Sequence, residues 1–198
     1  MRAIARGVGL GPASLYNYFD GLDDVFTMLI LSSYGTLASA TSTAVAAFAA
    51  APPADRAFIA ILAHRRWALA HRNEFNLIFT DQLPGYAAPP DGPTVAAQVA
   101  VFQPMIDALE EVDRPVAGMS SDETSVALWS AFHGFVTLEV NHHLDWLEDT
   151  AAAHEKAVRS SFVGAGLPAP GQGVRAQFER WARREAVAAG PRRAEPRS

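Results

Sequence analysis

The chain has 198 residues, a formal net charge of −5 and 49% hydrophobic residues, which suits one or two domains with ample material for a core. It contains no cysteine, so disulfide frameworks and thiolate chemistry are excluded. No run approaches the roughly 20 apolar residues of a membrane span, so we expect a cytoplasmic protein with no membrane partner.

The first predicted element is a pair of short helices joined by a tight turn, within residues 1–26. Ile4 and Val8 lie on one face of the first helix. Gly9 suits the turn because glycine adopts a left-handed backbone at little cost, and Pro12 suits the first turn of the next helix. Two helices joined in this way form the unit that places its second helix in the major groove of DNA.

The second of these helices carries most of the side chains that would reach DNA. Its outer surface offers hydroxyls, an amide and aromatic rings, which are types that contact phosphates and base edges. The candidate DNA-binding residues are Arg6, Ser14, Tyr16, Asn17 and Tyr18. Arg2 and Arg6 are the only basic residues within 1–26, so the electrostatic attraction to a DNA backbone is weak.

The remaining chain shows helical periodicity throughout and no alternating strand pattern, which predicts an all-α fold. A long helix with an acidic first turn begins at 20–21 and continues to the stop at Pro52. Further helices are expected at 54–72, 73–83, 94–112, 121–147, 151–165 and 174–189. Loops rich in Pro and Gly are expected at 84–93 and 166–173, and Pro104 is expected to kink its helix.

Two motifs carry a resemblance to a known family. The first comprises Ile4 and Ala5, the turn residues Gly9 and Leu10, the run SLYNYF at 14–19 and the acidic pair at 23–24. It resembles the helix-turn-helix of the TetR family of transcriptional repressors. The second, the run ALWSAFHGFVTLE at 127–139, is similar to a Trp–His–Gly signature in the ligand domain of one TetR branch. The resemblance implies that residues 14–18 lie on the recognition helix.

The resemblance also implies three regions. Residues 1–26 form a partial helix-turn-helix module, residues 27–166 a ligand-binding and dimerisation bundle, and residues 167–198 a linker, an extra helix and a disordered tail. Members of the family carry a whole helix before this motif, often with a basic arm, and the sequence begins inside the motif. We therefore expect Met1 to be an internal methionine of a longer protein.

Aromatic and histidine side chains on four predicted helices mark a candidate ligand pocket. Small apolar ligands bind inside helical bundles, and the resemblance implies an effector pocket there. The candidate pocket residues are Trp67, His71, Phe75, Phe79, Phe102, Met105, Trp129, Phe132 and His133. His133 is the leading polar candidate, because Gly134 beside it lets a ligand or another helix come close. The alternatives are that these rings are ordinary core and that His133 bonds to a neighbouring helix.

In TetR-like proteins the last two helices of the bundle pair across a two-fold axis, and here they correspond to about 122–147 and 151–165. Apolar residues with small neighbours on the second of these helices fit an isologous contact between two copies. The candidate dimer-interface residues are Ala152, Val158, Phe162 and Val163.

We expect no metal, cofactor or catalytic site. Glu139 and His142 form one Glu-x-x-His pair, but a di-iron bundle needs this motif twice and two further glutamates. No Ser–His–Asp spacing and no Gly-rich phosphate loop is visible. The sequence therefore predicts a dimeric, ligand-responsive repressor that binds operator DNA and is released by a small apolar effector. The alternative is a dimeric small-molecule-binding helical protein that has lost DNA binding through truncation.

Overall fold

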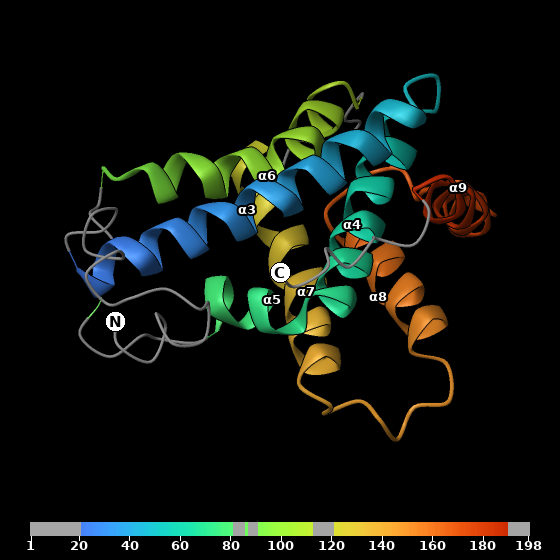
Figure 1. Ribbon diagram of the computed structural model, residues 1–198. Helices are drawn as coiled ribbons and strands as arrows, with labels where there is room; N and C mark the ends of the chain where they lie inside the picture. The colour runs from blue at the N-terminus through green and yellow to red at the C-terminus, as the bar shows by residue number, and fades with distance from the viewer. Residues whose placement is uncertain (1–20, 81–85, 87–90, 113–120, 190–198) are drawn as a thin grey trace.

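The structure is a computed structural model that describes residues 21–80, 86, 91–112 and 121–189 (Figure 1). The regular structure within these ranges is all helical, which confirms the predicted fold class. The helices are α3 (Leu22–Ala47), α4 (Pro53–Ala70), α5 (Arg72–Phe79), α6 (Pro93–Glu110), α7 (Ser121–Val140), α8 (Thr150–Gly164) and α9 (Val174–Ala188). Residues 1–20 of the predicted helix-turn-helix module lie outside the described residues, and the boundary expected at residue 26 falls inside the continuous helix α3.

Most expected helices begin and end within a few residues of the observed ones, but the helix expected at 121–147 is shorter. It ends at Val140, and a turn follows in which His142 has a φ of 63°. Arg72, at the start of α5, donates a hydrogen bond of 2.6 Å to the Val140 carbonyl. This contact satisfies one of the carbonyls that the end of a helix leaves free, so a residue from another helix helps to define where α7 stops.

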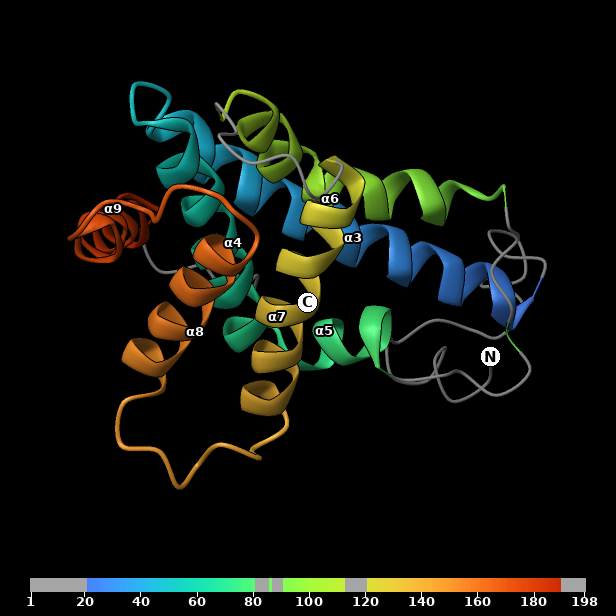
Figure 2. The same cartoon turned by 180° about the vertical axis from the view of Figure 1, so that it is seen from behind.

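Helices α3 and α6 lie side by side, and α7 and α8 form a second pair, as two opposite views agree (Figures 1 and 2). Helix α4 lies between the two pairs and contacts α3, α6, α7 and α9. Its buried residues include Phe58, Ile61 and Trp67. Every residue from 57 to 64 is buried. A helical stretch that is buried on all sides belongs inside a bundle, and α4 is accordingly the central helix of this one.

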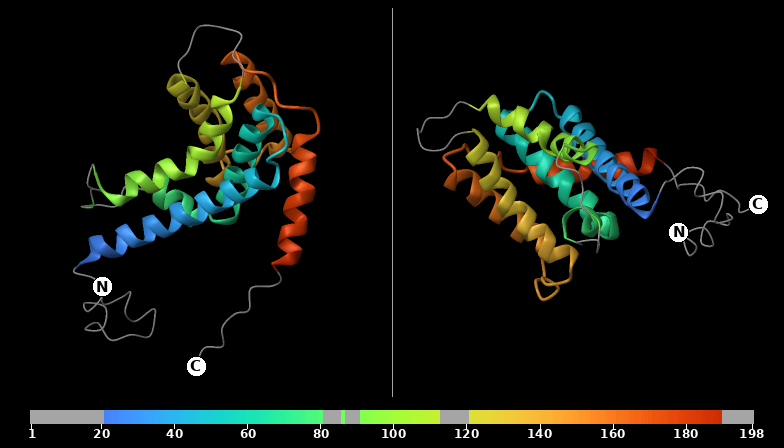
Figure 3. Two further views of the ribbon diagram at one scale, coloured as in Figure 1. Left: turned by 90° about the horizontal axis from the view of Figure 1, so that it is seen from above. Right: turned by 90° about the vertical axis from the view of Figure 1, so that its left-hand side faces the viewer.

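The extra helix at the C-terminal end belongs to the bundle. Val174, Phe178 and Ala182 of α9 join the same buried core as Phe58 of α4, and α9 runs across the other helices (Figure 3). Glu155 on α8 accepts a hydrogen bond of 2.6 Å from Arg175 on α9. The helix is therefore held both by apolar burial and by an ion pair with α8.

Candidate ligand site

A cluster of aromatic rings forms where α4, α5, α6 and α7 meet, and His64 lies at its centre. The side chain of His64 is 2% exposed. Its ring centroid lies 5.2–6.2 Å from those of five other rings. These rings belong to Phe75, Phe79, Phe102, Phe132 and His133. We call these six residues, together with Trp129, the ring cluster.

Local helical spacing places the rings of the cluster. Phe75 and Phe79 are four residues apart on α5, and their ring centroids lie 5.0 Å apart. Trp129 and His133 are four apart on α7, with centroids 5.7 Å apart. The helices then meet through Phe79 and His133, whose centroids lie only 4.7 Å apart. The cluster is thus built from two short-range pairs that tertiary packing brings into contact.

The cluster contains polar atoms that are buried and have no partner among the described residues. They are Nε2 of His64, Nε1 of Trp129, Nδ1 of His133 and, one turn further along α7, Oγ1 of Thr137. A buried polar group without a hydrogen bond costs about 1–3 kcal/mol. Four such atoms in one region are groups that an ordered water or a bound molecule would satisfy.

Both histidines of the cluster are neutral at neutral pH. Burial lowers the pKa of His64 from 6.5 to about 3, and repulsion from His133 and His154 acts in the same direction. Burial also lowers the pKa of His133. Each neutral imidazole offers one hydrogen-bond donor and one acceptor, so the cluster suits an uncharged ligand that can form hydrogen bonds.

The space between the rings is almost closed. A cavity of about 10 Å³ lies beside His64, and Thr41, Phe102, Met105 and Phe132 are among the residues that line it. This is room for about one water-sized sphere, whereas a drug-sized ligand occupies a pocket of about 300–1,000 Å³. A ligand could enter the cluster only if α5, α6 or α7 moved outward.

The nine predicted pocket residues do not form one pocket, which corrects the sequence-based expectation. Six of them belong to the ring cluster, and Met105 lines the small cavity beside it. Trp67 and His71 instead stack on each other, with centroids 5.0 Å apart, and line a separate groove against α3 and α9. The central residue, His64, was missed, although a lone histidine after the apolar run at 57–63 is a signal that could have found it.

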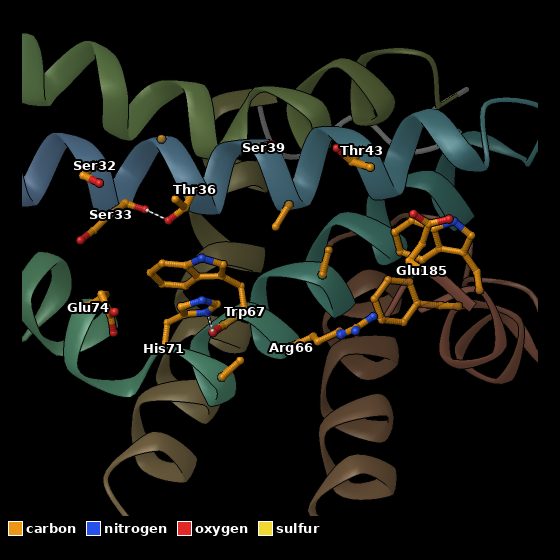
Figure 4. A pocket seen from close by; sticks show the side chains of 16 residues that line it. Ser32, Ser33, Thr36, Ser39, Thr43, Arg66, Trp67, His71, Glu74 and Glu185 are labelled. Atoms are coloured by element: carbon orange, nitrogen blue, oxygen red, sulfur yellow. Dashed lines mark hydrogen bonds between the residues drawn. The ribbon is translucent and has the colours of Figure 1, made fainter. Parts of the chain in front are cut away.

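The separate groove is much larger than the cavity in the ring cluster. It has a volume of about 780 Å³ and is lined by residues of α3, α4, α5 and α9, together with His71 (Figure 4). Hydroxyl side chains of α3 form one wall, and the Trp67–His71 stack lies opposite them. Figure 4 shows that Arg66 lies between this stack and the α9 side of the groove.

The predicted dimer-interface residues divide between the core and the surface. Val158 and Phe162 are buried in the core of the protomer itself, so they have no surface to offer to a second copy. Ala152 is half-buried, and Val163 is 61% exposed. Val126 and Leu138 on α7 are also exposed, by 56% and 45%. Of the predicted interface residues, Val163 is therefore the one that offers a large exposed apolar side chain.

The polar residues considered as a metal pair lie in different environments. Glu139 is buried and accepts two hydrogen bonds from Arg65 of α4, at 2.7 and 2.5 Å. Burial by itself would raise the pKa of the Glu139 carboxyl, but hydrogen bonds from Arg65 and Thr150 and the Arg65 charge outweigh it and lower the pKa. His142 lies in the turn after α7 and pairs with Asp145 at 3.1 Å.

The candidate DNA-binding residues at positions 6 and 14–18 lie outside the described residues. Of the helices that are described, none is both long and apolar enough to cross a bilayer.

Comparison with known proteins adds three findings. A family model for the Tetracyclin repressor-like, C-terminal domain matches residues 58–161, which include all of the ring cluster. The HTH-type transcriptional regulators Mb1846 of Mycobacterium bovis and Rv1816 of Mycobacterium tuberculosis are each 27% identical to the chain over 188 residues, with 80% of both proteins covered. The crystal structure of a candidate regulatory protein, SCO4313, is 28% identical with a TM-score of 0.67, covering 82% of this chain and 84% of that one.

Proposed function

The chain belongs to the Tetracyclin repressor-like family, and we propose that it is a ligand-responsive transcriptional repressor that binds operator DNA as a homodimer. The relatives named as HTH-type transcriptional regulators support the regulatory role. The helix-turn-helix motif within residues 1–26 supports DNA as the partner. The effector in this proposal is a small, uncharged, mainly apolar molecule.

The proposal that the protein responds to a ligand rests on the buried polar atoms of the ring cluster that have no hydrogen-bond partner. Nε2 of His64, Nε1 of Trp129 and Nδ1 of His133 are buried among aromatic rings with no partner in the described part of the chain. A purely structural core would place apolar side chains there, because each unpaired group destabilises the fold. A planar ligand with a hydrogen-bonding group would stack on the rings and satisfy these atoms.

Contacts between α5 and α3 offer a route from the ring cluster to the DNA-binding module. Tyr34 of α3 donates a hydrogen bond of 3.1 Å to the carbonyl of Ile78 on α5. Its ring also packs edge-on against Phe79, with centroids 5.9 Å apart. In the proposed mechanism a ligand separates Phe79 from His133, α5 shifts, and Tyr34 transmits the shift to α3. Because α3 begins at Leu22, directly after the recognition-helix motif, its tilt would change the separation of the two recognition helices.

The proposed dimer contact uses the exposed apolar residues of α7 and α8. Val126, Leu138 and Val163 are large apolar side chains that the protomer leaves in solvent. A two-fold axis at this side would bury the same residues of both copies against one another. This contact would hold two DNA-binding modules at a fixed separation, as a palindromic operator requires.

Fluorescence anisotropy on DNA tests the proposal. The duplex is the region upstream of the gene, and a scrambled duplex of the same composition is the control. Tighter binding to the upstream duplex, weakened by phenol but not by benzene, is the expected result, because only phenol can hydrogen-bond to the cluster. Equal binding to both duplexes, or none, would favour the alternative of a small-molecule-binding protein without DNA function.

A further inference from the structure

We propose that the groove between α3, α4 and α9 is a second ligand site, for an uncharged ring compound that carries several hydroxyl groups. The groove is distinct from the ring cluster, since the residues that line the groove include none of the cluster. Its volume of about 780 Å³ falls in the range of about 300–1,000 Å³ that is typical of small-molecule sites. The proposal does not depend on the function assigned to the ring cluster.

One wall of the groove is a row of hydroxyls on α3. Ser32, Thr36, Ser39 and Thr43 recur at intervals of three or four residues, so their side chains lie along one face of the helix (Figure 4). All four are exposed. Thr36 donates its own hydrogen bond to the Ser33 carbonyl, which leaves the oxygen lone pairs of its hydroxyl available to a ligand. This wall can both accept hydrogen bonds from a ligand and donate them.

Aromatic side chains lie at both ends of the groove. The Trp67–His71 stack, with an angle of 16° between the ring planes, forms one end. Phe178 and Trp181 of α9 form the other, with centroids 5.6 Å apart. Rings of this kind pack against the apolar faces of a ligand ring, while the α3 hydroxyls reach its polar edge. In addition, the indole Nε1 of Trp67 is buried and has no hydrogen-bond partner among the described residues.

The charged side chains that line the groove are of both signs. Arg66 lies between Glu74 on one side and Glu185 on the other (Figure 4). None of these three side chains makes an ion pair or a hydrogen bond with another side chain within the residues that the structure describes. An ion of either charge would lie near groups of both signs, and all three side chains are exposed, so solvent screens the attraction that an ion would gain here. A hydroxyl can donate to a glutamate and accept from an arginine, so a polyhydroxylated ligand satisfies all three.

A molecule in this groove would connect α3 to α9. The α9 residues of the groove lie outside the segment that the family model matches, which ends at residue 161. The α3 residues of the groove lie outside that segment as well, so the site is made mostly from helices beyond the matched range. Because the ligand would contact both α3 and α9, it would restrain the helix that follows the DNA-binding motif.

Isothermal titration calorimetry with four ring-containing probes tests the site. Phenyl β-glucoside is the uncharged ring compound with hydroxyls, benzoate is an anion, and benzyltrimethylammonium is a cation. Catechin, whose hydroxyls are on aromatic rings, distinguishes polyphenols from glycosides. The variant Ser39→Leu fills the groove from its exposed α3 wall. Ser42→Leu is the matched control, because Ser42 is also exposed on α3 but does not line the groove.

Phenyl β-glucoside or catechin should bind the unmodified protein more tightly than benzoate or the cation does. Ser39→Leu should weaken this binding by at least about tenfold, which corresponds to about 1.4 kcal/mol, while Ser42→Leu should leave it unchanged. Circular dichroism melting of both variants checks that the fold is retained. The proposal fails if neither hydroxylated probe binds, if a charged probe binds more tightly, or if the two leucine variants bind equally well.

Discussion

Acid should unfold this protein through two buried histidines, His64 and His154. His64 is 2% exposed and His154 is 0% exposed, so charging either ring would place an imidazolium in the core. Burial lowers the pKa of each from 6.5 to about 3. In an unfolded chain, by contrast, histidine is in water and titrates near its ordinary value of about 6.5.

The sign of the effect follows from proton uptake. Between pH 6.5 and pH 3 the unfolded chain binds protons at these two histidines and the folded chain does not, so the free energy of unfolding falls as the pH falls through this range. Each histidine contributes about 1.4 kcal/mol per pH unit, so two of them remove about 5 kcal/mol between pH 6.5 and 4.5. A loss of this size equals the whole stability of a marginal domain, about 5 kcal/mol.

Urea denaturation followed by circular dichroism, at several pH values from 7.5 to 4.5, measures the effect. The series stops at pH 4.5 because the pKa values of Glu139 and Glu155 are lowered from 4.5. The contribution of these two carboxylates to the free energy of unfolding is therefore lost only at more acidic pH. His154→Leu should remove about half of the pH dependence that His64 and His154 together cause, since both ring nitrogens of His154 lack a partner in the described structure and a leucine of similar size can replace it. His143→Leu, at an exposed position, is the control. A free energy of unfolding that stays constant from pH 6.5 to 4.5, or an equal pH dependence in His154→Leu and the unmodified protein, would refute the reasoning.

Four further predictions concern assembly, stability and coupling. Val163→Asp should convert dimers to folded monomers in sizing with light scattering, whereas Phe162→Asp should unfold the protomer, because it places a charge in the core. Glu139→Gln breaks the buried pair with Arg65 and should lower the free energy of unfolding in urea by about 3–5 kcal/mol; an unchanged urea midpoint would contradict the importance of this pair. Tyr34→Phe keeps the ring but loses the hydrogen bond to α5, so anisotropy should show unchanged DNA affinity and a weaker response to ligand, and an undiminished response would exclude this route. Asn17→Ala should narrow the difference in affinity between operator and scrambled DNA by about 1–3 kcal/mol, and an unchanged difference would remove Asn17 from base recognition.

Local sequence patterns determined the helices and the pairs of rings on them. The apolar periodicity of 3.6 residues and the Pro and Gly stops are properties of neighbouring residues, so the expected helices at 54–72 and 174–189 match α4 and α9 closely. The same spacing placed Phe75 beside Phe79 and Trp129 beside His133. The end of α7 was missed because it depends on a contact from Arg72, which is distant in the sequence.

Only the tertiary structure decided which neighbour each buried face meets. Because α4 is buried on all sides over residues 57–64, its periodicity does not reveal that His64 lies in the ring cluster while Trp67 lines the groove against α3. The same limit explains why Phe162 was predicted at the dimer interface although it lies in the core of the protomer. An apolar face on α8 can be buried by its own protomer or by a second copy, and both arrangements require the same residue types. The amino-acid sequence therefore determined that these side chains leave water, and the packing of the bundle determined which residues they pack against.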